Sequence, residues 1–191
     1  MLPAELMGLK EKNFKKFNYL IKNKRFLENL IINVENIIHY VKKNKKNSII
    51  LNYDESSENF FKWYQQLTAE SLGKKSKGIT PIISSMPKDN HSLLQLYLDG
   101  PKNCFFTFFN VTSKTSNKQS NKFILDDKKY LKNKNLSEIL EAQEKSTQNI
   151  FRKKNIPFRS FNINKKDENT LGELFCFCVL ETILLGHALT V

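Results

Sequence analysis

The sequence predicts an α/β protein, a three-layer αβα sandwich built on a mainly parallel sheet. Residues 48–53 form an apolar run that is continuous rather than alternating, which is typical of a strand buried on both faces of a parallel sheet. Similar runs alternate along the chain with longer segments whose apolar residues recur at helical spacing. The connections between them are short, which favours βα units with right-handed crossovers.

The size and composition of the chain favour one globular unit. It has 191 residues, of which 40% are hydrophobic and 15 are phenylalanine. This length is sufficient for one ordinary domain with a proper core, and two compact domains would be crowded. We therefore expect residues 1–191 to form a single domain.

The first half of the chain predicts helix, strand and helix in that order. Residues 26–41 carry apolar side chains at helical spacing with charges between them. The strand at 48–53 follows, and Asp54 is expected to cap the next helix. That helix ends at Glu70 and is expected to turn an apolar face inward through Phe60, Phe61, Tyr64 and Leu67.

The next segments predict two more strands around a helix. A strand at 79–83 contains Pro81, which indicates a sheet edge or a bend. A helix is expected over 91–99, capped by Asp89 or Asn90, which would leave His91 at the helix mouth beside free backbone N–H groups. The aromatic-rich strand at 104–111 is expected to be the most central one.

The last part of the chain predicts a loop, a helix, a strand and a final helix. Residues 112–122 are rich in Ser, Thr, Asn and Lys without apolar periodicity, so we expect a mobile loop. A long amphipathic helix should begin at Asn135 or Ser137, and a strand should follow at 158–163. Residues 170–173 fit a capping box for the last helix.

The final segment, residues 174–191, is apolar enough to raise the question of a membrane anchor. Glu181 in its middle would cost about 2.5–3.5 kcal/mol at a bilayer centre. We therefore expect a buried helix, in the core or at a dimer interface.

The formal net charge of +12 raises the hypothesis of nucleic-acid binding. Only Arg25, Arg152 and Arg159 among the 31 basic residues are arginines, however, and the lysines are scattered. Since base and phosphate recognition favours the arginine fork, nucleic-acid binding is not the favoured interpretation.

The cysteines and the first residues bear on the compartment. There are three cysteines, and an odd number without a regular framework argues for a reducing compartment. Cys176 and Cys178 are two apart in a predicted helix, so their side chains diverge and core packing is the favoured role. Residues 1–5 lack the basic start and apolar run of a cleavable signal, and we expect a cytoplasmic protein.

Two residues are candidates for acid–base chemistry. Glu70 is expected at the end of a helix, directly before a Ser-Leu-Gly-Lys turn, where a base can be both held and reached. His91 is expected to open the helix after the following strand. Spacing alone makes them only a candidate pair.

The residues around this pair resemble glucose-6-phosphate isomerase, in particular the second sugar-isomerase domain of the bacterial enzymes. The resemblance runs in unbroken order over nearly the whole chain, through residues 65–74, 77–81, 91–100, 136–139 and 171–175. It implies a Rossmann-like sugar-isomerase domain and no metal or organic cofactor.

The resemblance also implies a mechanism. Glu70 stands at the position of the base that moves a proton between C2 and C1 through a cis-enediolate, interconverting glucose 6-phosphate and fructose 6-phosphate in glycolysis and gluconeogenesis. His91 stands at the position of the ring-opening histidine, which in the family reaches into the active site of the neighbouring subunit. A homodimer is therefore implied, and the positive charge would help to attract a sugar phosphate.

Parts of the family pattern have no counterpart in this chain. They are the Ser/Thr phosphate loops of the first domain, the Gly-Gly-Arg motif, and the C-terminal signature with its catalytic lysine. We expect the second half of an isomerase, without the first domain and the C-terminal tail and with little or no turnover alone. A non-catalytic, sugar-phosphate-binding regulatory module of the same fold remains the alternative.

Overall fold

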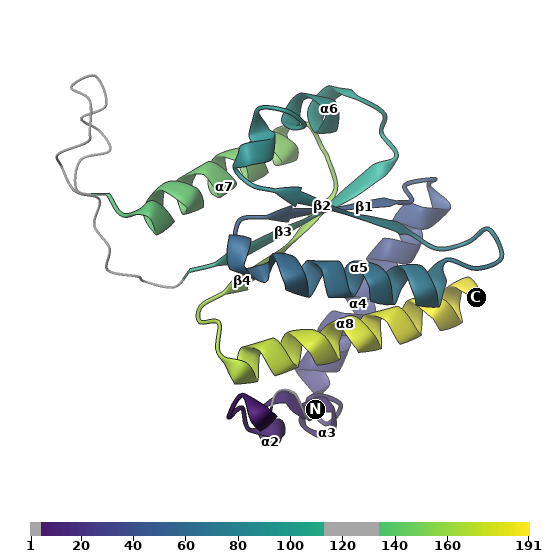
Figure 1. Cartoon of the computed structure of the whole chain (residues 1–191). Helices are drawn as coiled ribbons and strands as arrows, with labels where there is room; N and C mark the ends of the chain where they lie inside the picture. Colours follow the sequence, from purple (N-terminus) through teal and green to yellow (C-terminus); the bar gives the residue numbers. More distant parts are fainter. Residues whose placement is uncertain (1–4, 113–133) are drawn as a thin grey trace.

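The computed structural model describes residues 5–112 and 134–191, and these contain one four-stranded sheet in which every neighbouring pair is parallel. The order across the sheet is β2-β1-β3-β4 (Figure 1). The strands are β1 (Asn47–Asn52), β2 (Thr80–Ser85), β3 (Cys104–Val111) and β4 (Phe158–Ile163). Both the edge position of the strand with Pro81 and the central position of β3 are confirmed.

Helices cover both faces of the sheet, which confirms the three-layer sandwich. In Figure 1 one face carries α6 (Leu94–Asp99) and α7 (Leu136–Lys153). The other carries α4 (Lys24–Lys42), α5 (Glu58–Leu72) and α8 (Glu168–Leu189). The short helices α2 (Glu11–Phe14) and α3 (Phe17–Leu20) lie beyond α8, away from the sheet.

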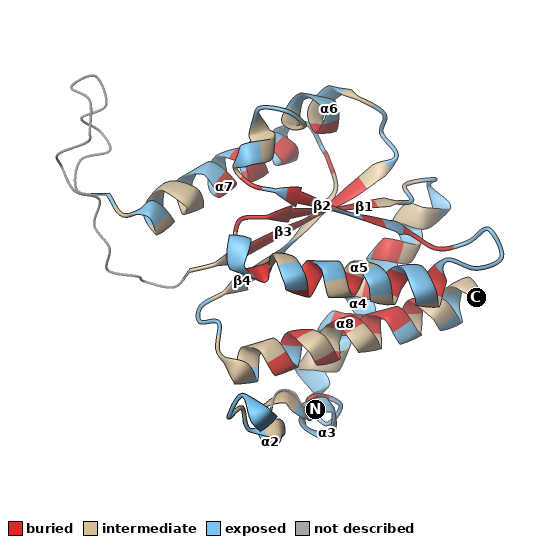
Figure 2. Cartoon of the chain, viewed as in Figure 1, coloured by how far each residue is buried: buried red, intermediate tan, exposed pale blue. Residues whose placement is uncertain are grey.

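The core follows from the two-residue period of the strands. On the α6–α7 face, Ile49 and Leu51 pack in one cluster with Phe106, Phe108 and Phe151. The intervening side chains face α4, α5 and α8, where the core contains Ile50 and Phe109 among others. Figure 2 shows the resulting band of buried residues along the sheet and along the inner sides of the helices.

Three predicted helix starts are wrong. Asp54 precedes a 3₁₀ turn (Glu55–Ser57), and its carboxylate accepts from the hydroxyls of Ser56 and Ser57 rather than from helix amides. The helix predicted over 91–99 begins only at Leu94, after a second 3₁₀ turn (Lys88–Asn90). Helix α8 begins at Glu168, where Asp167 accepts from the Thr170 amide. Of these three helices only α8 has a side-chain cap, from Asp167. Helices α5 and α6 begin without one, because the Asp54 and Asp89 carboxylates bond to neighbouring groups instead.

Other predictions are confirmed. Helix α7 begins with a full capping box between Asn135 and Glu138. The cysteines of the described residues are free, and Cys176 and Cys178 are buried. The loop predicted at 112–122 lies outside the described residues from 113 onward.

Helix α8 is the one helix of the described ranges that is long and apolar enough to cross a membrane. In the structure it packs against α4 and α5, and Glu181 in its middle has no exposed surface. A core helix of a soluble protein passes the same test, and the buried carboxylate fits the predicted core role.

Candidate active site

Glu70 lies in the last turn of α5 with its side chain exposed to solvent. Its Oε1 accepts a hydrogen bond of 2.8 Å from Nε2 of Gln66, one turn earlier. The helix beneath it is firmly placed, because Gln65 Nε2 donates to the Pro81 carbonyl of β2 at 2.8 Å and Leu72 is buried. The structure therefore confirms the expected position of Glu70 at the reachable end of a rigid helix.

The loop after Glu70 is tied to the end of α8. Lys77 Nζ donates to the Leu189 carbonyl at 3.0 Å, and Lys75 Nζ donates to the Thr190 carbonyl at 3.3 Å. Gly78 has φ +103°, and a Cβ there would lie 2.4 Å from the Leu72 carbonyl oxygen. Only glycine fits this position without displacing the end of α5.

His91 lies on the turn between β2 and α6, with its side chain exposed. Its backbone N–H donates to the Lys88 carbonyl at 3.3 Å. The expected place at a helix mouth beside free amides is wrong, because residues 91–93 form a turn and α6 begins at Leu94.

The structure does not bring Glu70 and His91 together. Strands β1 and β2 are parallel, so α5 must run back from the carboxyl edge of the sheet to the amino edge, and it ends there with Glu70. His91 follows the last residue of β2, at the carboxyl edge. At about 3.3 Å per residue, β2 alone separates the two edges by roughly 16 Å. One copy of the chain thus presents the two groups at opposite edges.

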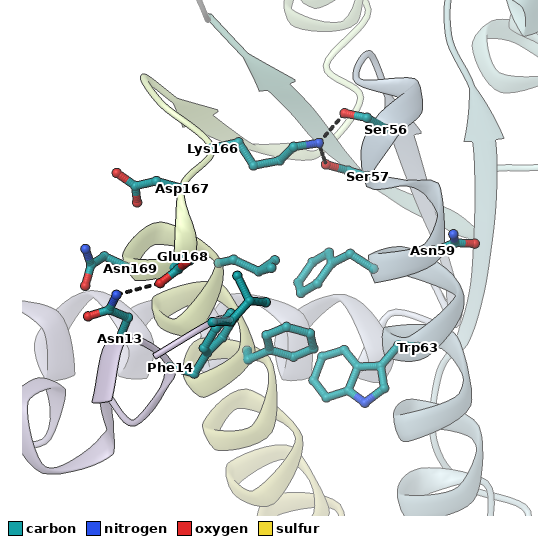
Figure 3. A pocket seen from close by; sticks show the side chains of 14 residues that line it. Asn13, Phe14, Ser56, Ser57, Asn59, Trp63, Lys166, Asp167, Glu168 and Asn169 are labelled. Atoms are coloured by element: carbon teal, nitrogen blue, oxygen red, sulfur yellow. Dashed lines mark hydrogen bonds between the residues drawn. The ribbon is translucent and has the colours of Figure 1, made fainter. Parts of the chain in front are cut away.

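A pocket of about 800 Å³ contains neither of them. It opens at the carboxyl edge between α5, α8 and the N-terminal segment (Figure 3). Trp63, Phe60 and Phe175 form an aromatic wall, in which the ring centroids of Trp63 and Phe175 are 4.4 Å apart.

The polar end of this pocket is built by Lys166, a residue that the sequence pattern gives no reason to single out. Its Nζ lies 2.8 Å from Oδ2 of Asp54 and also donates to Ser56 and Ser57 (Figure 3). Partial burial raises the pKa of Asp54, but the hydrogen bonds from Lys166, Ser57 and Ser56 outweigh it and hold that pKa below its usual value. The Lys166 ammonium is thus already partnered by a carboxylate.

Comparisons with known proteins identify relatives but no family model, since none matches this sequence. A glucose-6-phosphate isomerase of Methanocaldococcus jannaschii is 32% identical over 170 residues, covering 88% of this chain and 42% of the relative. A probable glucose-6-phosphate isomerase of Methanococcus maripaludis is 36% identical over 153 residues, covering 79% of this chain and 34% of the relative. The chain spans about two fifths or less of the length of these curated relatives.

Two solved structures share the fold. A hypothetical protein from Thermus thermophilus superposes with a TM-score of 0.82 at 21% identity, over 94% of this chain and 44% of that one. A glucose-6-phosphate isomerase from Chlamydia trachomatis superposes with a TM-score of 0.57 at 16% identity, over 74% of this chain and 30% of that one. The two structures show the shared fold. The sequence matches make the chain a relative of the glucose-6-phosphate isomerases over most of its length.

Proposed function

We propose that this chain supplies two catalytic groups of a glucose-6-phosphate isomerase, which interconverts glucose 6-phosphate and fructose 6-phosphate. The observation that carries the proposal is the sequence match to enzymes of that name over most of the chain. In this proposal the described residues form a sugar-isomerase domain of a cytoplasmic enzyme of glycolysis and gluconeogenesis.

Glu70 is the proposed base. Isomerisation requires a proton to leave C2 and return to C1 on one face of a cis-enediolate, and one carboxylate can do both. An exposed carboxylate on the last turn of an anchored helix fits this task, because the group is held while the substrate can approach it. Such general acid–base steps contribute roughly 10²–10⁴-fold each.

His91 is the proposed ring-opening group, acting in the site of a second copy. The separation of Glu70 and His91 across the sheet supports this arrangement, because a single copy cannot present both groups to one sugar. A symmetric homodimer brings the two edges together twice.

The surroundings of Glu70 suit an anionic substrate. Lys74, Lys75 and Lys77 follow it on the adjoining loop, all of them exposed. Their positive field would draw a sugar phosphate toward the base. By resemblance to the family, the phosphate loops and a catalytic lysine come from segments without a counterpart here, so we expect little turnover from this chain alone.

The test is a coupled assay that follows fructose 6-phosphate to glucose 6-phosphate. It is run on this chain and on a longer polypeptide whose flanking segments come from its own gene or from the Methanocaldococcus jannaschii relative. We expect activity in the longer polypeptide and a loss of about 10²–10⁴-fold in Glu70→Gln.

The matched control is Glu58→Gln, which removes the same charge from the first turn of the same helix. It should leave the rate nearly unchanged. Folded protein without turnover in either length would refute the isomerase proposal and favour the regulatory sugar-phosphate module.

A further inference from the structure

We propose that Asp89 is a positioning residue that clamps the turn carrying His91 onto the end of β2. The inference rests on the proposed function, because it assigns Asp89 a role through His91. Asp89 lies two residues before His91 and belongs to the 3₁₀ turn that links β2 to α6.

The first half of the clamp reaches back to the strand. Oδ2 of Asp89 accepts a hydrogen bond of 2.7 Å from the backbone N–H of Ser85, the last residue of β2. The same oxygen accepts from Oγ of Ser84 at 2.9 Å, and Ser84 has no exposed surface. Hydrogen bonds to an ionised acceptor are shorter and stronger than those between neutral groups, so the carboxylate ties the turn to a buried part of the sheet.

The second half of the clamp reaches past His91. Oδ1 of Asp89 lies 3.5 Å from Oγ of Ser92, at the limit of a hydrogen bond. The Asp89 carbonyl accepts from the N–H of Leu93 at 2.8 Å. His91 therefore lies between Asp89, which is bonded to β2, and Ser92 and Leu93, which are both bonded to Asp89.

His91 depends on these contacts for its placement. Its side chain is exposed, and no hydrogen bond to the imidazole is present within residues 5–112 and 134–191. The backbone of the turn sets where the Cβ of His91 lies, and so the region that the imidazole can reach. A small misplacement of a catalytic group can cost about 10²-fold in rate, so the anchoring of this turn bears directly on ring opening.

The proposed contacts of Asp89 predict different effects for two substitutions of this residue. Asp89→Ala removes both oxygens and frees the turn. Asp89→Asn keeps one oxygen for the Ser85 amide, and its NH₂ group can donate to the Ser92 hydroxyl. The conservative variant should therefore rescue most of what alanine loses.

The experiment uses the active longer polypeptide. We expect Asp89→Ala to lower kcat by about 10- to 100-fold, with KM changed far less, and Asp89→Asn to stay within about threefold of the parent. Asp99→Ala is the matched control, because it removes an exposed, lysine-paired carboxylate at the far end of α6. The control should keep the parental rate.

A double substitution distinguishes positioning from general destabilisation. If Asp89 acts through His91, the pair Asp89→Ala with His91→Ala should be no slower than His91→Ala alone. A further loss equal to that of Asp89→Ala by itself would overturn the proposal. Should Asp89→Ala not fold, Ser92→Ala removes one contact of the clamp, and the same comparison with His91→Ala decides.

Failure of this inference is distinct from failure of the proposed function. If the parent is active and Asp89→Ala is equally active, only the role of Asp89 is overturned, and the isomerase proposal stands. Absence of turnover in the parent, in every form tested, overturns the isomerase proposal and this role with it.

Discussion

Glu181 is a carboxylate with no exposed surface in the middle of α8. Three neighbouring elements, α4, α5 and β4, supply its partners. Tyr64 Oη donates to its Oε1 at 2.8 Å, Arg159 pairs with both of its oxygens, and Asn33 donates to Oε2. The guanidinium is itself held by Thr107, whose Oγ1 accepts from Nε at 2.9 Å. The result is a fully partnered buried charge, the condition under which such a charge is tolerated.

Removing either partner of the Arg159–Glu181 ion pair should destabilise the fold. We expect Arg159→Met to lower the free energy of unfolding by about 3–5 kcal/mol, because Glu181 then stays buried without a counter-charge. Urea unfolding of this chain measures the change. Arg25→Met, at an exposed position of α4, is the control and should have little effect.

The combined variant Arg159→Met with Glu181→Leu removes the stranded charge and should recover part of the loss. An Arg159→Met protein as stable as the parent would show that the pair contributes nothing to the fold.

Such a cluster is beyond what the sequence can predict. Residues 33, 64, 107, 159 and 181 stand on five different elements, and no spacing in the chain connects them. In the sequence, Glu181 stands out only as an obstacle to membrane insertion. By contrast, Glu70 and His91 lie in contiguous strings, which is why each can be proposed as a candidate without the fold.

At the scale of elements, two glycines of α8 do different work. A Cβ on Gly172 would lie 2.7 Å from the Asn13 carbonyl oxygen and from the Phe14 Cα, which are backbone atoms of α2. A Cβ on Gly186 would meet only the Leu72 side chain, at an ordinary 3.5 Å. Gly172 therefore permits the N-terminal helices to pack on α8. Gly186 has room for a side-chain methyl group.

Alanine substitution of the two glycines should therefore have different effects. Gly172→Ala should loosen α2 and α3 from α8, and faster amide hydrogen exchange over residues 11–20 would measure this. Gly186→Ala should be neutral or stabilising by up to about 1 kcal/mol, since alanine favours helix over glycine. Equal exchange over residues 11–20 in both variants would contradict the assigned role of Gly172.

Element types are more predictable than element starts. Strands β1 and β3 begin within one residue of expectation, because continuous apolar runs have sharp ends, and β4 begins at the expected residue directly after Pro157. The sequence pattern misses the starts of α6 and α8 because caps are chosen by competition. Asp89 serves the end of β2 instead of a helix, and Asp167 captures the Thr170 amide before Thr170 can act as a cap.

At the scale of the whole molecule, the sheet divides the proposed site between its two edges. If two copies complete it, Glu70→Gln and His91→Ala damage opposite halves of each site. Mixed subunits of the active polypeptide should then recover about a quarter of the parental activity, since half of the random dimers hold one intact site of two.

The measurement is the coupled assay after the inactive variants have been unfolded together and refolded. Each variant refolded alone is the control and should stay inactive. Absence of recovery, with mixed dimers demonstrated by mass, would place both groups in one subunit's site or in none.

The central strand has a consequence for the making of the protein. β3 carries Phe105, Phe106, Phe108 and Phe109, all buried in the finished sheet between β1 and β4. β4 leaves the ribosome only after the whole of α7 has been synthesised. At about 5–20 residues per second, the most apolar strand of the nascent chain waits several seconds with one edge open. The open edge of β3 is therefore the part of the nascent chain most prone to pairing with another chain during synthesis.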